Sequence, residues 1–204
     1  MGRRRLWFIA MLMVCALVIA SCATTPDTRT VVTGTWMADN FNKKFSKVLI
    51  VAVSDEFGIR GDFEKTVARR LDMDGVRAEP SSDIMPLEQK IDRESVKAAM
   101  AGKNFNAVLV ARLIGMENES TYVPPSVDMT FDSTFIRGGP TVDVSPEHTV
   151  HSSVVTLQFD LFDTETEHIV WSMKSQTFNL TNVAAASDTL ADAIASDLKA
   201  KGLI

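Results

Sequence analysis

The sequence predicts an α/β domain over residues 46–204, built on a single mixed β-sheet packed with helices. Three observations lead to this fold class. Two nearly continuous apolar runs, residues 47–54 and 106–114, have the composition of strands buried on both faces. Helical periodicity separates these runs, and two alternating apolar runs follow them. We therefore expect a parallel strand-helix-strand-helix-strand core plus an antiparallel hairpin.

The first strand and helix of this core are residues 47–54 and the segment that follows them. Phe63, Val67 and Leu71 are spaced at i, i+4 and i+8, so they share one face of a helix. Gly75 then supplies the left-handed residue that commonly ends a helix.

The second half of the core repeats the pattern. Residues 76–80 predict a short strand that ends at Pro80. Asp92 is the expected cap of the next helix and Gly102 its stop. The run 106–114 returns as a strand, and we expect it to form the centre of the sheet together with 47–54.

The carboxyl-terminal third predicts a hairpin and a helix. Apolar residues alternate with polar ones over 155–161 and again over 169–173, on either side of a short polar turn. A last helical stripe over 190–198 follows, with Ser187 or Asp188 as its expected cap.

The amino-terminal residues have the order of an export signal. Three arginines at positions 3–5 precede the apolar run 6–20, after which small residues follow. Ile19-Ala20-Ser21-Cys22 resembles the lipobox of bacterial lipoproteins. The resemblance implies cleavage between Ser21 and Cys22, and attachment of diacylglycerol and usually a third chain such as palmitate to Cys22.

Two alternatives compete with this reading. An uncut membrane span needs roughly 20 apolar residues, and this run has about 15. Cys15 is a second candidate for the lipid, but Val14 is too large for the cleavage position. We therefore expect a signal peptide over 1–21 and a lipidated tether over 22–45.

The lipid predicts where the protein is held. Burial of acyl chains contributes about 0.8 kcal/mol per methylene, so several chains anchor a protein permanently. Ala23 follows the cysteine, whereas an aspartate there resembles the inner-membrane retention signal of many lipoproteins. We expect a lipid-anchored protein of the outer membrane that faces the periplasm.

The charge of the mature chain excludes several functions. Removing 21 of the 204 residues leaves 183, with 18 basic residues (21 minus the three leader arginines) and 26 acidic ones, a net charge of −8. An acidic chain disfavours nucleic acid as a partner. Cys15 would leave with the signal and Cys22 would carry lipid, which excludes disulfides, zinc-thiolate sites and cysteine nucleophiles.

The sequence gives no catalytic residue and no cofactor or metal site. The turn after the first strand holds Gly58 and Gly61 among acidic residues, without G-x-G-x-x-G spacing, so we expect no nucleotide. The histidines are His148, His151 and His168. His168 could approach His151 across the hairpin, but surface histidines flanking a turn are the expected arrangement.

Residues 117–148 predict a loop of unusual length for a compact domain. It is rich in Pro, Gly, Ser and Thr, with an alternating stretch from Val127 that could be a strand. Tyr122, Phe131 and Phe135 are its expected partner-binding residues, since exposed aromatic residues dominate binding energy at interfaces. The alternative is an insertion without a role.

Several segments together carry a resemblance: "NAVLVARL", "TYVPP", "LFDTETEHIVWS" and the last helix. The chain resembles a group of uncharacterised bacterial lipoproteins. Its domain order is more distantly similar to the periplasmic α/β domains of the curli secretion lipoprotein, the TolB amino-terminal domain and the lipoprotein activators of penicillin-binding proteins. These resemblances imply binding and assembly rather than catalysis.

Three hypotheses about function follow. The first is a non-catalytic binding or assembly module of the bacterial cell envelope, with an envelope protein or glycan as partner. The second is a subunit of an oligomeric outer-membrane secretion or assembly complex, which would need amphipathic hairpins. The third is a periplasmic hydrolase whose site the sequence does not reveal.

Overall fold

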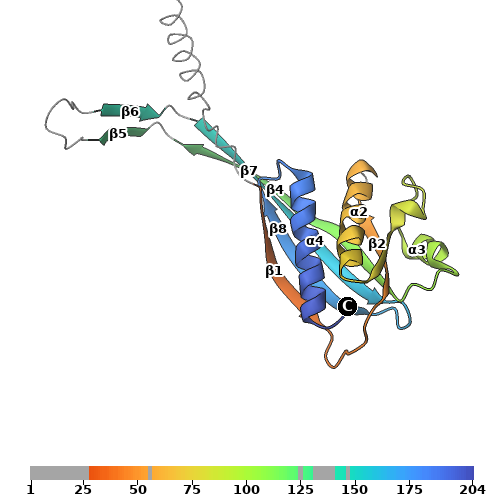
Figure 1. Cartoon of the computed structure of the whole chain (residues 1–204). Helices are drawn as coiled ribbons and strands as arrows, with labels where there is room; N and C mark the ends of the chain where they lie inside the picture. Colours follow the sequence, from red (N-terminus) through yellow and green to blue (C-terminus); the bar gives the residue numbers. More distant parts are fainter. Residues whose placement is uncertain (1–27, 55–56, 124–125, 131–140, 146–147) are drawn as a thin grey trace, which may run out of the picture.

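The computed structural model describes residues 28–54, 57–123, 126–130, 141–145 and 148–204, with side chains described outside 57 and 119–152. A six-stranded mixed sheet organises it, in the order β1-β8-β7-β4-β2-β3 (Figure 1). This confirms the predicted α/β class. The strands of this sheet are β1 (Arg29–Met37), β2 (Lys47–Val53), β3 (Arg77–Pro80), β4 (Ala107–Val123), β7 (His148–Asp163) and β8 (Ile169–Phe178).

The sheet is parallel at one side and antiparallel at the other. Strand β2 pairs in parallel with both β3 and β4, as the core pattern predicted. Strands β4, β7, β8 and β1 are joined by antiparallel pairs, and β7 with β8 is the predicted hairpin. The middle of the sheet is β7 and β4 rather than β4 and β2, because β1 adds a strand beyond the hairpin.

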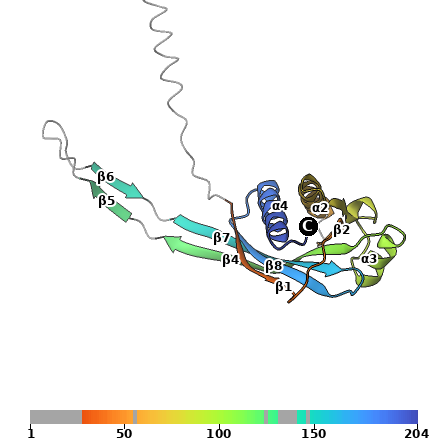
Figure 2. The ribbon, with the colours of Figure 1, turned by 60° about the horizontal axis from the view of Figure 1, so that its bottom comes forward.

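Two long helices cover one face of the sheet. They are α2 (Phe57–Met73) and α4 (Val183–Ala200), which lie side by side in Figures 1 and 2. Val67 and Leu71 of α2 are buried against Ile50 and Leu109 in the main core. Trp171 of β8 is also fully buried, and its Nε1 donates to Asp197 Oδ2 of α4 at 2.6 Å.

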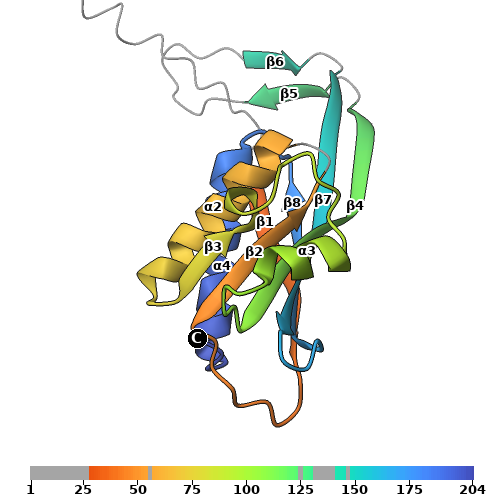
Figure 3. The same ribbon diagram turned by 90° about the vertical axis from the view of Figure 1, so that its right-hand side faces the viewer.

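The other face is only partly covered. The short helix α3 (Arg93–Met100) lies over its β2 and β4 side, on the opposite side of the sheet from α2 and α4 (Figure 3). A smaller apolar cluster forms there around Leu49, Val51, Phe105 and Val108. No residue of α3 itself is buried, so this helix stands on the sheet without closing the space beneath it.

The helix ends follow local chemistry, with one correction. Asp92 caps α3 as predicted, in a reciprocal capping box with Ser95. Helix α4, however, begins at Val183, because the Asn182 side chain accepts a hydrogen bond from the Ala185 backbone N–H at 3.0 Å. The predicted cap at Ser187 or Asp188 was therefore wrong by five or six residues, about one and a half turns.

The prediction of a tether over 22–45 was wrong for its second half. Residues 29–37 form β1, an edge strand paired with β8 from Arg29↔Phe178 to Met37↔Trp171. Thr28 already contacts the body, because its Oγ1 donates to the Asn179 carbonyl at 2.8 Å. The domain thus begins by residue 28 rather than 46.

The prediction of a loop over 117–148 was wrong for residues 117–123, 126–130 and 141–145, which are strands, and the strand considered from Val127 is present; residues 124–125, 131–140 and 146–147 lie outside the described residues. Strand β4 continues to Val123 and β7 begins at His148, and the two pair along this whole length. Beyond them, β5 (Ser126–Thr130) and β6 (Thr141–Ser145) form a second two-stranded ribbon. We call residues 117–123 and 148–154, with β5 and β6, the arm; it reaches away from the body in Figures 1 and 2.

Candidate functional site

The structure reaches only part of the predicted site. Ser21, Cys22, Phe131 and Phe135 lie outside the described residues, so cleavage, lipid attachment and two of the aromatic contacts stay predictions. Tyr122 lies in β4, where its backbone is paired with Thr149 of β7. None of the helices within the described residues has the length and apolar character to cross a membrane.

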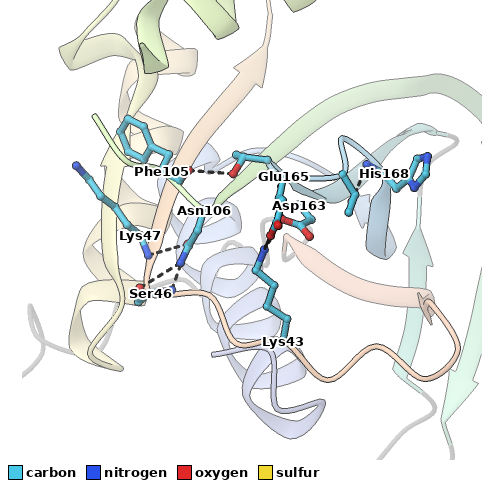
Figure 4. Close-up of polar contacts among 10 residues, drawn as sticks. Lys43, Ser46, Lys47, Phe105, Asn106, Asp163, Glu165 and His168 are labelled. Carbon is cyan, nitrogen blue, oxygen red and sulfur yellow. Dashed lines mark hydrogen bonds and ion pairs between the residues drawn. The ribbon is translucent and has the colours of Figure 1, made fainter. Parts of the chain in front are cut away.

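The two histidines considered for a metal site are far apart. His151 is paired with Ser120 inside the arm, whereas His168 lies at the turn that joins β7 to β8 (Figure 4). Residue 163, where β7 ends, lies twelve residues after His151, about 40 Å along the strand. Elsewhere in the described part of the chain, no group of three or more His, Cys, Asp or Glu could hold a metal ion.

A groove of about 820 Å³ lies between α3 and the sheet. Its floor consists of apolar side chains that point away from α2 and α4, and its wall is the apolar side of α3. The floor is Val51, Val108, Val110 and Phe162, and the wall is Val96 and Met100. We call this space the α3 groove.

One end of the α3 groove is fixed by polar contacts (Figure 4). Asn106 Oδ1 accepts hydrogen bonds from the backbone N–H groups of Ser46 and Lys47, at 3.3 and 3.0 Å. Thr164 Oγ1 donates to the Phe105 carbonyl at 2.9 Å. These bonds hold the loop before β2, the start of β4 and the turn after β7 in one place.

Lys43 ties the same end to the β7–β8 turn. Its Nζ lies 2.8 Å from Asp163 Oδ1 and 3.0 Å from Glu165 Oε2 (Figure 4). The hydrogen bond to Asp163, followed by that to Glu165, raises the pKa of Lys43 above its ordinary value. Lys43 is therefore cationic at any physiological pH and serves to hold the turn.

Charged residues hold α3 at the rim. Glu167, in the β7–β8 turn, pairs with both Arg93 and Lys97 of the helix. Asp92 is the cap, and the hydrogen bond from the Ser95 backbone N–H lowers the pKa of its carboxyl below the ordinary value. Since no α3 residue is buried, these contacts carry much of the attachment of the helix.

Arg112 lies at the opposite end of the groove. Its guanidinium pairs with Asp160, which is 1% exposed and also accepts from Gln158 Nε2 at 2.9 Å and Ser172 Oγ at 2.6 Å. Arg112 itself is about half exposed. A buried, fully bonded carboxylate thus positions a half-exposed cation beside apolar Val110.

A second polar cluster is entirely buried, and sequence reasoning missed it. Glu64 Oε1 accepts from the Ala52 backbone N–H at 2.8 Å, from Arg60 Nε at 3.2 Å and from Ser81 Oγ at 2.7 Å. Its Oε2 accepts from the Ser82 backbone N–H at 2.7 Å. The cluster joins α2, β2 and the short 3₁₀ helix η1 (Ser81–Asp83), so its role is structural.

The arm differs from the rest of the sheet in its edges. Strand β2 pairs with β4 only as far as Arg112, and β8 pairs with β7 only as far as Val154. Within the described residues, no other strand pairs with 117–123 or 148–153, and the one further backbone bond is from the Asn179 N–H to the Ser153 carbonyl at 2.8 Å. Each of these strands has one edge whose backbone groups lack a strand partner.

Comparisons with known proteins identify no family. No family model matches the chain, and no curated protein matches it. Among solved structures it is similar to the PelC dodecamer from Paraburkholderia phytofirmans, at 13% identity and a TM-score of 0.44 over 83% of this chain and 95% of that one.

Two further solved structures are similar over most of their length. A lipoprotein from Neisseria meningitidis matches at 12% identity and a TM-score of 0.39, over 76% of this chain and 98% of that one. A putative neuraminyllactose-binding hemagglutinin homolog from Helicobacter pylori matches at 15% and 0.34, over 78% and 87%. All three TM-scores are below 0.5, so none of these likenesses bears on what this chain does.

Proposed function

We propose that the chain is a membrane-anchored, non-catalytic binding or assembly module of the bacterial cell envelope, lipidated at Cys22 and facing the periplasm. Its partner contact is the arm. The observation that supports this is the long pairing of β4 with β7 beyond the body, which leaves both outer edges of the arm without a strand partner among the described residues.

A two-stranded ribbon is a poor free-standing structure. In water it is marginally stable at best, and three strands or a packed face are needed for independent stability. Unpaired edges also attract other strands, and natural proteins usually cover or shorten them. Among the described residues, no strand covers the arm over its pairs from Asn118↔Ser153 to Val123↔His148. This favours a partner that pairs with the arm or packs on it.

The register of β5 and β6 separates apolar from polar residues. Val127 is paired with Val144, and Met129 with Val142, whereas Asp128 is paired with Asp143. Because successive strand residues belong to opposite faces, the four apolar residues share one face of the ribbon. We infer that this face meets the partner and that the aspartate face stays in water.

The position of the anchor also favours the arm. Arg29, Phe178, Val154 and Glu117 are consecutive partners across β1, β8, β7 and β4. The start of β1 therefore lies about 14 Å from the root of the arm, three strand spacings away. Cys22 precedes Thr28 by six residues, at most about 20 Å of extended chain, so a lipid there would keep the root of the arm close to the membrane.

A second candidate function rests on the same free edges. Each copy offers one β4 edge and one β7 edge, so neighbouring copies could pair arm to arm in a repeating, head-to-tail manner. This would make the chain a subunit of an oligomeric outer-membrane secretion or assembly complex. The hydrolase hypothesis is not favoured, because His151 and His168 lie at opposite ends of β7.

Removal of the arm tests the proposal. Replacing 118–153 by Asn-Gly joins Glu117 directly to Val154, its own cross-strand partner, by a two-residue hairpin turn. The body should keep its melting temperature, while crosslinking to partners in intact envelopes should be lost. A sharp fall in melting temperature would show that the arm belongs to the core and would refute the proposal.

Site-specific crosslinking separates the two candidate functions. A photo-reactive residue at Val127 should capture a partner, whereas the matched control at Asp128, on the opposite face, should not. A ladder of multiples of this chain would favour the oligomeric subunit, and one different protein would favour the binding module. Equal capture at both positions would contradict the assignment of faces.

A further inference from the structure

The α3 groove is a second binding feature, on the body rather than on the arm. Val51, Val108, Val110 and Phe162 make an apolar floor, and α3 stands over it with no buried residue. We propose that the α3 groove binds a single acyl chain with an anionic head group, the chain along the floor and the head group at Arg112.

The backbone beneath the groove favours an acyl chain over a peptide. The floor belongs to β2, β4 and β7. At this level β4 and β7 have paired strands on both sides. Strand β2 pairs with β3 only as far as Ile50, and beyond it the Ala52 N–H donates to Glu64. Along β4 and β7 the floor thus offers no free backbone donor or acceptor. A peptide would bring one N–H and one C=O per residue, and burying each without a partner costs free energy. An acyl chain brings none.

The volume of the groove is sufficient for an acyl chain. At about 820 Å³ it lies within the usual range for small-molecule sites. The labelling experiment below compares one acyl chain with a two-chain phospholipid.

Arg112 supplies the charge for the head group. Among the described residues, its guanidinium donates only to Asp160, whose carboxylate also accepts from Gln158 and Ser172. Further N–H groups of Arg112 are thus left for a carboxylate, and a half-exposed guanidinium is well suited to bind one. Val53 and Val110, at the same end of the groove, would line the first methylenes.

The other charged groups around the groove already hold the helix and the turn. Arg93 and Lys97 both pair with Glu167, and Asp163 is paired with Lys43. The carboxylate of Asp92 accepts the capping bond of α3. Arg112 is paired as well, but its partner Asp160 also accepts from Gln158 and Ser172, and the Arg112 guanidinium is half exposed at the rim.

This inference does not rest on the arm or on its partner. The groove residues of β4 precede Leu113, and the arm begins at Glu117, so the arm deletion described above leaves the groove intact. A result that refutes one proposal would therefore not affect the other.

Photo-labelling of the full chain in lipid nanodiscs tests the inference. The probe is palmitic acid with a diazirine at its methyl end, and the labelled peptides are mapped by mass spectrometry. We expect labels in α3, in residues 105–112 and near Phe162, and competition by unlabelled palmitate. Labels elsewhere, absence of competition, or equal labelling by a diazirine phospholipid would overturn the proposal.

Variants of the groove test the site of the acyl chain separately from the site of the head group. Val110→Trp fills the groove from the floor and Val96→Trp from the helix, and either should abolish labelling. Val32→Trp, on the exposed edge strand, is the matched control and should leave it unchanged. Val96→Trp keeps the test valid if the floor variant fails to fold, and persistent labelling in a folded groove variant would refute the site.

The role of Arg112 has its own readout. Arg112→Gln should raise the palmitate concentration for half-maximal competition about tenfold, because a charge-assisted hydrogen bond is lost. Hexadecanol, which has the same chain without the charge, should compete equally in both proteins. An equal loss for acid and alcohol would show that Arg112 only shapes the groove and would overturn the head-group assignment.

Discussion

The buried carboxylate of Glu64 gives the sharpest stability prediction. Glu64 is 0% exposed, Arg60 is 1% exposed, and the two form an ion pair one helical turn apart in α2. The change Glu64→Leu removes four accepted hydrogen bonds and leaves the Arg60 guanidinium buried without its counter-charge. We expect a severe loss of stability.

The magnitude follows from the partners that remain. Breaking a buried ion pair by removing one member typically costs about 3–5 kcal/mol. The Arg60 guanidinium keeps bonds to the Leu87 carbonyl and to Ser81 Oγ, both at 3.0 Å, which argues for the middle of that range. With a urea dependence of about 2 kcal/mol per molar, a loss of about 4 kcal/mol lowers the unfolding midpoint by about 2 M.

Urea unfolding of the full chain, followed by the emission of buried Trp171, measures this loss. The matched control is Glu88→Leu, at an exposed carboxylate, which should shift the midpoint little. The double change Arg60→Met with Glu64→Leu should recover part of the loss, since the unpaired charge is gone while two backbone N–H groups stay unsatisfied. If Glu64→Leu costs no more than Glu88→Leu, the reasoning is wrong.

Four further predictions follow. Leu109→Asp, on the buried face of β4, should prevent folding, whereas Val110→Asp, which faces the groove, should cost less and leave a protein whose melting can be measured. Because the capping bond that lowers the pKa of Asp92 stabilises α3 only while the carboxyl is ionised, hydrogen-exchange protection of α3 should hold above about pH 4 and fall below it; Asp92→Ala, which removes the cap, should show the low protection already at pH 7. Cys22→Ser should leave an uncleaved or mis-sorted precursor, and a mature amino terminus that starts at an unmodified residue in the parent protein would refute the lipid assignment. Deletion of Ile114 should change the distance between spin labels on the arm and on the body while the melting temperature stays the same.

Local signals in the sequence predicted most of the body. The apolar run 47–54, the helical stripe after Phe63 and the cap at Asp92 each depend on neighbours within a few residues, and each appears in the structure. The start of α4 was missed because its first turn, Val183 and three alanines, has little periodicity to mark it. In that helix Asn182, five or six residues upstream of the expected cap, determines the start.

Strands without a buried face were not predictable in the same way. A hydrophobic alternation arises when one face of a strand packs on a core, and residues 117–121 of β4 carry polar residues at successive positions. Their pairing with 150–154 is set by the register of β4 and β7 inside the body, which is long-range information. Residues 29–37 do hold β-branched Thr and Val, a signal outweighed by their position after the signal peptide.

The groove and the ion pairs were not predictable either, because they depend on contacts that local sequence patterns do not show. The sequence shows that Val108 and Val110 are apolar, but not that the helix over them leaves a space, because that depends on how α3 sits on the sheet. The pairing of Arg112 with Asp160 joins residues 48 positions apart. Even the ion pair of Arg60 with Glu64, at helical spacing, carries no sign in the sequence that it is buried.

One strand connects the core, the groove and the arm. Ala107, Leu109 and Ala111 of β4 are buried beneath α2 and α4, while Val108, Val110 and Arg112 face the groove. Between this part and the arm, the register with β7 shifts from Leu113 to Gly115, so Ile114 is an extra residue opposite the partner strand. Such a bulge bends and twists a strand, which sets the direction in which the arm leaves the body. Pairing continues normally from Gly115↔Thr156, so removing Ile114 would keep the residue pairs of the arm but change the direction of the arm. The deletion therefore tests the direction of the arm separately from its folding.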